Sequence, residues 1–197
     1  MIQYRLTRLT PSAGEMLELA SVAGARFDLR VLEEAAESRL AAPLEEAVGS
    51  GMIEELPGPQ ISYRFSHELV RRALYDRLAR ARCAELHRRY GDALERVHAG
   101  NTDRVASELA HHFAVAAPLG ESERAVRYNL RAAELAMGAF GFEEAAARLS
   151  TALGLGMAGG SDRGRAELEL SRALWITGKQ ERAVEVLEDA RETARAV

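Results

Sequence analysis

Few side chains of this protein can transfer protons, bind metal or act as nucleophiles: it has one cysteine and five histidines. Cys83 and His87 stand four positions apart, so on a helix they share a face, but the sequence offers no third metal ligand beside them. His111 and His112 are adjacent and point about 100° apart on a helix, so we expect one to pack and the other to be solvated. No spacing of serine, histidine and carboxylate suggests a nucleophile elbow. The sequence therefore predicts a chain that is not an enzyme and holds no metal.

Phosphate-binding loops are also missing from the sequence. It contains no G-x-x-x-x-G-K-[ST] loop and no G-x-G-x-x-G turn after a strand, so the chain alone is not expected to bind a nucleotide or any other cofactor in these ways. His67 stands in the first turn of a predicted helix, where unpaired N–H groups and the helix dipole attract anions. The side chain can meet a phosphate there. The alternative is that His67 caps the helix or packs against the preceding strand.

Residues 61–100 form a basic segment, with nine arginines against five carboxylates in a chain of net charge −4. One interpretation is a solvated face, on which the arginines pair with carboxylates at helical spacing: Glu68, Asp76, Glu85 and Asp92. The other is a docking surface for an acidic or phosphate-bearing partner. The candidate contacts of that surface are Arg71, Arg72, Arg88 and Arg89.

Composition places the chain among ordinary globular proteins. It has 197 residues, of which 47% are hydrophobic and 28% charged, and this excludes whole-chain disorder. The single cysteine excludes an internal disulfide and fits a reducing compartment. No apolar run approaches the roughly 18 residues needed to span a bilayer, and residues 1–5 carry no signal-peptide pattern. We therefore expect a cytoplasmic protein that does not bind membranes.

The first sixty residues are predicted to form three short helices. Thr10 caps a first helix that has a proline in its opening turn, and Asp28 caps a second. Ser38 is expected to cap a third, the alternative being that Pro43 makes this helix start later or bend. The inner face of this third helix is predicted to carry Leu40, Leu44 and Val48.

A change of periodicity after the third helix indicates a hairpin. Residues 52–56 and 61–65 flank a turn with two prolines and a glycine, and the second run alternates apolar and polar residues. Three helices followed by a two-stranded hairpin is the layout of a winged helix. Ser66 is then expected to cap a helix that buries Leu69, Val70 and Leu74.

The sequence of the third predicted helix bears on direct DNA binding. In a winged helix that reads DNA, this helix should be basic and polar. Glu45 and Glu46 stand there instead and would repel phosphates, and the turn at 57–60 carries no charge. We therefore do not expect direct nucleic-acid binding. A DNA-binding winged-helix regulator is kept as a third alternative.

The second half of the chain is predicted to consist of helical pairs. A helix over about 102–116 precedes pairs at 121–138 with 141–154 and at 162–177 with 179–195, separated by the glycine-rich stretch 154–160. The second helices of the two pairs share a spacing of small and large residues. The matched positions are Ala145 and Ala183, Leu149 and Leu187, and Ala152 and Ala190.

This spacing resembles the tetratricopeptide repeat, in which small residues let antiparallel helices approach closely. The matched positions lie 38 residues apart, against a usual period of about 34, so the glycine-rich stretch reads as a four-residue insertion. A generic array of helical hairpins is the alternative. The predicted fold is mainly α: a winged-helix-like domain at 1–80, connecting helices at 81–118, and tetratricopeptide-like pairs at 119–197.

Several segments together resemble a known family. Residues 8–13 (RLTPSA) open a helix, residues 63–75 read YRFSHELVRRALY, and residues 86–89 (LHRR) and 108–113 (ELAHHF) follow in order. This pattern is similar to the region after the ATPase domain in bacterial signalling ATPases of the STAND class. These include large LuxR-type transcriptional regulators and relatives fused to nucleotide cyclase domains.

The resemblance implies a regulatory and sensor module rather than a catalyst. An ATPase domain upstream would hold ATP or ADP, the winged helix would dock on that domain in cis, and His67 would contact the ADP phosphate. The helical repeats would bind a protein or small-molecule effector along their concave face. The main alternative is a free-standing tetratricopeptide adaptor, in which the N-terminal part is only a cap.

Overall fold

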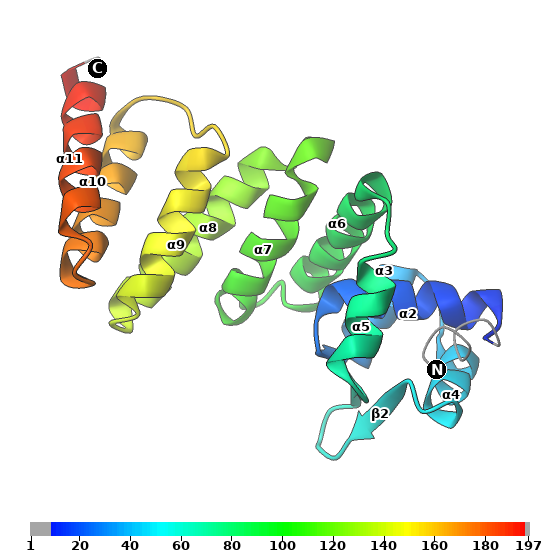
Figure 1. The fold of residues 1–197 in the computed structure, drawn as a ribbon. Coiled ribbons are helices and arrows are strands. Elements are labelled where there is room, and N and C mark those ends of the chain that lie inside the picture. The colour runs from blue at the N-terminus through cyan, green and yellow to red at the C-terminus, as the bar shows by residue number, and fades with distance from the viewer. Residues whose placement is uncertain (1–8, 196–197) are drawn as a thin grey trace. The chain divides into compact units, whose positions relative to one another are not determined.

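The computed structural model describes residues 9–195, so segment 1–8, with which the predicted winged-helix-like domain begins, lies outside it. The described chain is mainly helical and has a small antiparallel sheet, which confirms the predicted mainly α class (Figure 1). It divides into two compact units, Met1–Ala99 (unit 1) and Gly100–Val197 (unit 2).

Unit 1 combines five described helices with the sheet. Its elements are α2 (Pro11–Ala23), β1 (Arg26–Asp28), α3 (Leu29–Ala36), α4 (Ala41–Gly49), β2 (Ile53–Leu56), β3 (Ser62–Phe65), α5 (Glu68–Tyr75) and α6 (Arg80–Val97). Two predicted caps are confirmed: Thr10 Oγ1 accepts a hydrogen bond from Ala13 N at 3.3 Å, and Asp28 Oδ1 accepts one from Arg30 N at 2.7 Å. These side chains satisfy N–H groups that a helix start leaves unpaired.

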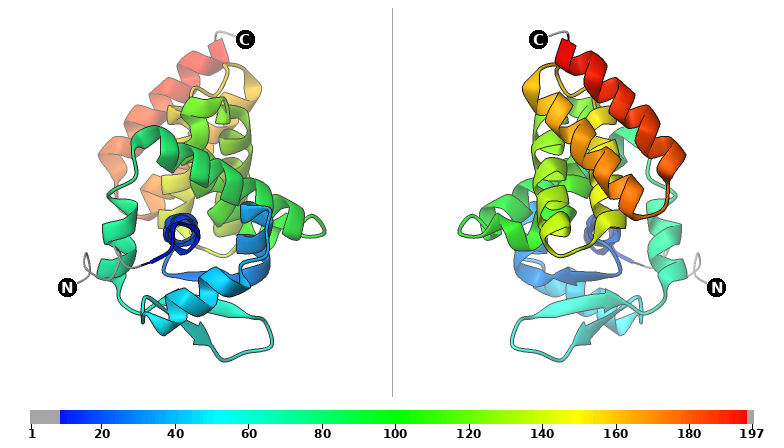
Figure 2. Two further views of the ribbon diagram at one scale, coloured as in Figure 1. Left: turned by 90° about the vertical axis from the view of Figure 1, so that its right-hand side faces the viewer. Right: turned by 90° about the vertical axis from the view of Figure 1, so that its left-hand side faces the viewer.

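The sheet has three strands in the order β1-β3-β2, where the sequence indicated only the β2–β3 hairpin (Figure 2). The missed strand β1 pairs antiparallel with β3, with Phe27 opposite Tyr63. Phe27 stacks on that ring at 5.9 Å and tilts against Phe65 at 5.8 Å. A three-residue strand is too short to show alternation, so only its backbone pairing with β3 defines it as a strand.

Helix α4 begins later than a cap at Ser38 would place it, which is the alternative that Pro43 left open. Its N-cap is Leu40, which makes no side-chain capping bond, so Ser38 is not the cap. Pro43 therefore falls in the first turn, where a missing N–H breaks no helical hydrogen bond. Leu44 and Ala47 are buried, whereas Val48, predicted to face inward, is 40% exposed.

The start of α5 also differs from the prediction. His67 is the N-cap, with an extended backbone, so Ser66 does not cap the helix. Val70 and Leu74 are buried as predicted, but Leu69 is 68% exposed. Helix α5 has eight residues, or only about two turns. Val70 and Leu74 stand four positions apart and occupy its inward side, so Leu69 points away from the core.

Unit 2 is a succession of helices, each packed on the next. Its elements are the 3₁₀ turn η1 (Thr102–Val105), α7 (Ala106–Ala116), η2 (Ala117–Leu119), α8 (Ser122–Gly138), α9 (Phe142–Gly154), α10 (Ser161–Ile176) and α11 (Gln180–Arg195). The predicted pairs α8–α9 and α10–α11 are present, and α9 also packs on α10. Ala145, Ala152, Ala183 and Ala190 are buried in these contacts. In α11 it is Val186, rather than the predicted Leu187, that is buried.

The two compact units do not coincide with the predicted domains. Helix α6 packs on α2 and α3 within unit 1, and α7 packs on α8 within unit 2. The segment 81–118, predicted as connecting helices, is therefore divided between the units at Ala99 and Gly100. Contacts between helices determine the boundary between the units, and the sequence pattern does not show which helices are in contact.

Two equivalent turns of unit 2 adopt left-handed backbone conformations with different residues. The α10–α11 turn uses Gly178 at φ 78°, whereas the α8–α9 turn uses Phe140 at φ 60°. A Cβ disfavours this conformation, so glycine is its usual occupant. The Phe140 side chain is 80% exposed and touches Phe142 edge-on, at 6.2 Å between ring centroids.

Candidate functional site

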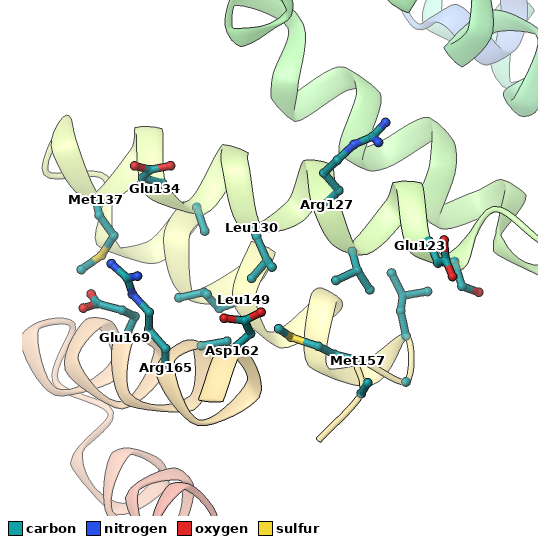
Figure 3. Close-up of a pocket in the computed structure, with 17 residues that line it drawn as sticks. Glu123, Arg127, Leu130, Glu134, Met137, Leu149, Met157, Asp162, Arg165 and Glu169 are labelled. Carbon is teal, nitrogen blue, oxygen red and sulfur yellow. The ribbon is translucent and has the colours of Figure 1, made fainter. Parts of the chain in front are cut away.

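A cavity of about 950 Å³ lies in unit 2 among α8, α9, the α9–α10 loop and α10 (Figure 3). We call it the groove. Its floor is apolar and includes Val126, Leu130, Met137, Leu149 and Met157. Its rim carries charges from α8 and α10, namely Glu123, Arg127, Glu134, Asp162, Arg165 and Glu169. An apolar surface with a few charged groups around it is typical of a ligand-binding site.

Helix α8 supplies one complete side of the groove. The lining residues recur along it at intervals of three and four: Ser122, Glu123, Val126, Arg127, Leu130, Ala133, Glu134 and Met137. Residues at these spacings share one face of a helix. The opposite face buries Ala125, Tyr128 and Asn129, where Asn129 Nδ2 donates to Ala110 O of α7 at 3.3 Å. Because that opposite face packs on α7, the lining face of α8 points away from α7.

The α9–α10 loop forms a second wall of the groove. Residues 155–158 line it, and they fall in the stretch that the sequence indicated as an insertion in the repeat. Gly156 has φ 82°, a conformation that a side chain would disfavour. Gly154, Gly156 and Gly159 have the spacing of a dinucleotide-binding turn, but they follow helix α9 and not a strand.

His67 lies at the start of α5, as predicted. Its side chain is exposed and makes no capping hydrogen bond. Next to it, Ser66 Oγ is buried and has no hydrogen-bond partner among the described residues. The exposed imidazole is accessible to a partner from outside the unit, and its contact with a phosphate stays a prediction.

The four arginines predicted as an interaction surface contact different parts of unit 1. Arg71 donates to Ser21 O of α2 at 3.1 Å and also pairs with Glu68. Arg88 pairs with Glu85 at 2.7 Å along its own helix. These hydrogen bonds lower the pKa of both glutamates. Both arginines form the helical-spacing ion pairs of the solvated-face interpretation, and Arg71 in addition joins α5 to α2.

Arg89 and Arg72 differ most among the four. The Arg89 guanidinium donates to Ala35 O from Nη2 at 2.7 Å and from Nε at 3.2 Å, which joins α6 to the last turn of α3. The Arg72 side chain is 72% exposed and lies 3.4 Å from Asp76. Arg72 thus projects from the surface, whereas Arg89 bonds to another element of unit 1.

This contrast predicts unequal effects on stability. Arg89→Met removes charged hydrogen bonds to a backbone carbonyl, so we expect the free energy of unfolding to fall by about 1–3 kcal/mol. Arg72→Met removes an exposed ion pair and should change it by no more than about 0.5 kcal/mol. Urea unfolding followed by circular dichroism measures both variants. Equal losses in the two would contradict the structural role assigned to Arg89.

Cys83, Tyr75 and His87 form a hydrogen-bonded line between the end of α5 and α6. Cys83 Sγ donates to Tyr75 Oη at 3.3 Å, and Tyr75 Oη lies 3.0 Å from His87 Nε2. Burial, together with the Cys83 thiol, raises the pKa of Tyr75 to about 12. The phenol therefore stays protonated at neutral pH. Tyr75 belongs to α5, and Cys83 and the fully buried His87 belong to α6, so the cluster is a contact between two helices.

The other histidine pair also follows the expectation. His112 is buried and His111 is exposed, as predicted for adjacent positions on one helix. In residues 9–195, no group of three His, Cys, Asp or Glu side chains is arranged to hold a metal ion. None of the helices described here has both the length and the apolar character needed to cross a bilayer.

No protein-family model, curated protein or solved structure matches this chain. The groove and the exposed end of α5 are therefore the two features from which a function can be argued. The sequence indicated the exposed end of α5 through His67, but it did not indicate the groove. The signals for the groove were the inserted loop at 155–158 and the charged and apolar face of α8.

Proposed function

We propose that this chain is the regulatory and sensor part of a STAND-type signal-transducing ATPase, a transcriptional regulator of the LuxR type, and that it catalyses no reaction itself. The observation that carries this proposal is the groove of about 950 Å³ on unit 2. A ready-made groove with an apolar floor and a charged rim suits the reversible binding of an effector.

In this proposal unit 1 is a winged-helix-like domain and unit 2 a tetratricopeptide-like array. The order of α2, α3 and α4 before the β2–β3 hairpin supports the first assignment. Buried alanines between successive helices, such as Ala145 and Ala183, support the second. Unit 1 docks on the ATPase domain, and the exposed His67 reaches the phosphate of bound ADP.

Unit 1 is assigned to docking rather than to DNA because of its charges. In α4, Glu45 is exposed, and the Glu46 carboxylate is held by Thr10, whose backbone N donates to it at 2.8 Å. Both are carboxylates, which repel a phosphate backbone. The exposed turn at 57–60 carries no charge that could replace them.

Regulation requires that the effector distinguish two states of the protein. Unit 1, docked on the ADP-bound ATPase domain, holds the closed state. An effector in the groove shifts the population toward the open state only to the extent that it binds that state more tightly. The proposal therefore predicts that effector binding and ADP binding oppose each other.

The phosphate role of His67 is tested in a protein that carries this chain behind its ATPase domain. A hydrogen bond to a charged group contributes about 1.5–3 kcal/mol, so His67→Ala is expected to speed ADP release by about 10-fold or more. His98→Ala, which removes another imidazole of unit 1, is the matched control. Release of a fluorescent ADP analogue measures both variants, and unchanged release in His67→Ala would disprove the contact.

One observation favours the free-standing adaptor as a second candidate. The residues lining the groove all lie between Ser122 and Glu169, within unit 2, so a ligand can be held without unit 1. An adaptor predicts that excised residues 100–197 capture the same partner as the whole chain with equal affinity. The sensor proposal predicts that this affinity changes when ADP is bound to the ATPase domain.

A further inference from the structure

We infer that the groove takes a basic, amphipathic peptide segment of a partner protein. This inference rests on the groove being the binding site of the proposed function and specifies the chemistry of its ligand. Three features of unit 2 carry it: the length of the groove, the composition of its floor and the sign of its rim.

The length of the groove favours a peptide over a compact metabolite. The α8 residues that line it run from Glu123 to Met137, four turns of helix or about 21 Å at about 1.5 Å per residue. An extended peptide of about six residues, or a helix of about 14, covers this distance. A compact ligand would leave most of the lining unused.

The floor suits a row of apolar side chains. Leu130, Met137 and Met157 are partly buried against the core formed by α8 to α11, and Leu149 is a buried member of that core beneath them (Figure 3). Methionine side chains are flexible and polarizable, so they adapt to different apolar partners. A helix that lays one apolar face into such a groove uses anchors at i, i+3, i+4 and i+7.

The rim gives the expected charge of the ligand. It holds four carboxylates against two guanidinium groups: Glu123, Glu134, Asp162 and Glu169 against Arg127 and Arg165. Within residues 9–195, Glu123 and Asp162 form no ion pair, whereas Glu134 lies 2.5 Å from Arg131 Nη1. Figure 3 shows Arg165 beside Glu169 at one end of the groove and Glu123 at the other. The excess of negative charge favours a ligand with lysine or arginine beside its apolar residues.

The test uses the whole 197-residue chain and two fluorescent synthetic peptides of about 14 residues. Both carry leucine at i, i+3, i+4 and i+7; one has lysine and the other glutamate at the remaining positions. Fluorescence anisotropy should show the lysine peptide binding at least about 10-fold more tightly, with an affinity that falls as salt rises. Equal binding of the two peptides, or no binding of either, overturns the inference.

Two double variants separate the groove from the net charge of the protein. Glu123→Gln with Asp162→Asn removes the unpaired rim carboxylates and should weaken the lysine peptide about 5-fold. Glu188→Gln with Asp189→Asn makes the same charge change on the exposed surface of α11, outside the groove, and should leave affinity within about 2-fold. An equal loss in both double variants would also overturn the inference, because binding would then follow net charge alone.

The outcomes distinguish this inference from the proposed function. If neither peptide binds but His67→Ala speeds ADP release, the sensor proposal stands and the ligand has another chemistry. If the lysine peptide binds through the groove but ADP release is unaffected, the peptide site stands and the free-standing adaptor is favoured.

Discussion

Replacing Phe113 with alanine is expected to lower the free energy of unfolding of unit 2 by about 3–5 kcal/mol. Phe113 is fully buried and is among the largest such side chains of the described chain. Its ring stacks on Tyr128 of α8 at 5.7 Å, and the Arg124 guanidinium lies 3.8 Å from the ring centroid. Truncation therefore opens a cavity between α7 and α8 and removes an aromatic and a cation–π contact.

The single tryptophan makes this prediction measurable for unit 2 alone. Trp175 lies in α10, so its fluorescence during urea unfolding reports the unit that contains Phe113. Phe140→Ala is the matched control because Phe140 is 80% exposed; it should change stability by no more than about 0.5 kcal/mol. A loss below about 1 kcal/mol in Phe113→Ala would contradict the packing of α7 on α8 described above.

His87→Ala is expected to lower the free energy of unfolding of unit 1 by about 2–4 kcal/mol. The imidazole is fully buried and lies 3.0 Å from Tyr75 Oη. Its removal leaves a cavity between α6 and its neighbours and deprives the half-buried Tyr75 phenol of a hydrogen-bond partner. Both effects destabilise the contact between α5 and α6.

His67, at the start of α5, and His87 of α6 provide a matched comparison. His67 is exposed and makes no capping bond, so His67→Ala should leave stability within about 0.5 kcal/mol. Hydrogen exchange of the peptides from α5 and α6 should rise strongly in His87→Ala and stay unchanged in His67→Ala. If exchange rises equally in both, His67 is part of the fold, and its effect on ADP release would no longer report a phosphate contact.

The alternative assignments of the basic segment show how tertiary contacts change the meaning of a sequence pattern. The four candidate arginines have the same charge and similar positions on predicted helices. Arg89 nevertheless bonds to Ala35, 54 residues earlier in the chain, while Arg72 extends from the surface. Only the folded unit distinguishes them, because the partner of Arg89 is remote in sequence.

Local features were predictable because their causes lie within a few residues. The caps of Thr10 and Asp28 depend on a side chain and an N–H two or three positions away. The helical pairs at α8–α9 and α10–α11 follow from a 3.6-residue apolar period and from small residues at fixed spacing. The β2–β3 hairpin follows from alternation around a proline-rich turn.

Elements defined by distant partners were not predictable in this way. Strand β1 exists because residues 26–28 pair with residues 62–64, more than thirty residues later. Leu69 has the same apolar character as Val70, and its exposure depends on where α5 meets the rest of unit 1. Periodicity along a short helix does not specify the direction from which it is covered.

The sequence by itself thus determined a mainly helical chain with a hairpin and the starts of α2 and α3. The tertiary structure decided which residues line the groove. The groove is lined by residues from α8, such as Glu123, from α10, such as Asp162, and from α9 and the inserted loop between them. The physical reason is that a groove is a property of how helices pack, and the packing of α8, α9 and α10 brings together side chains that lie tens of residues apart along the chain.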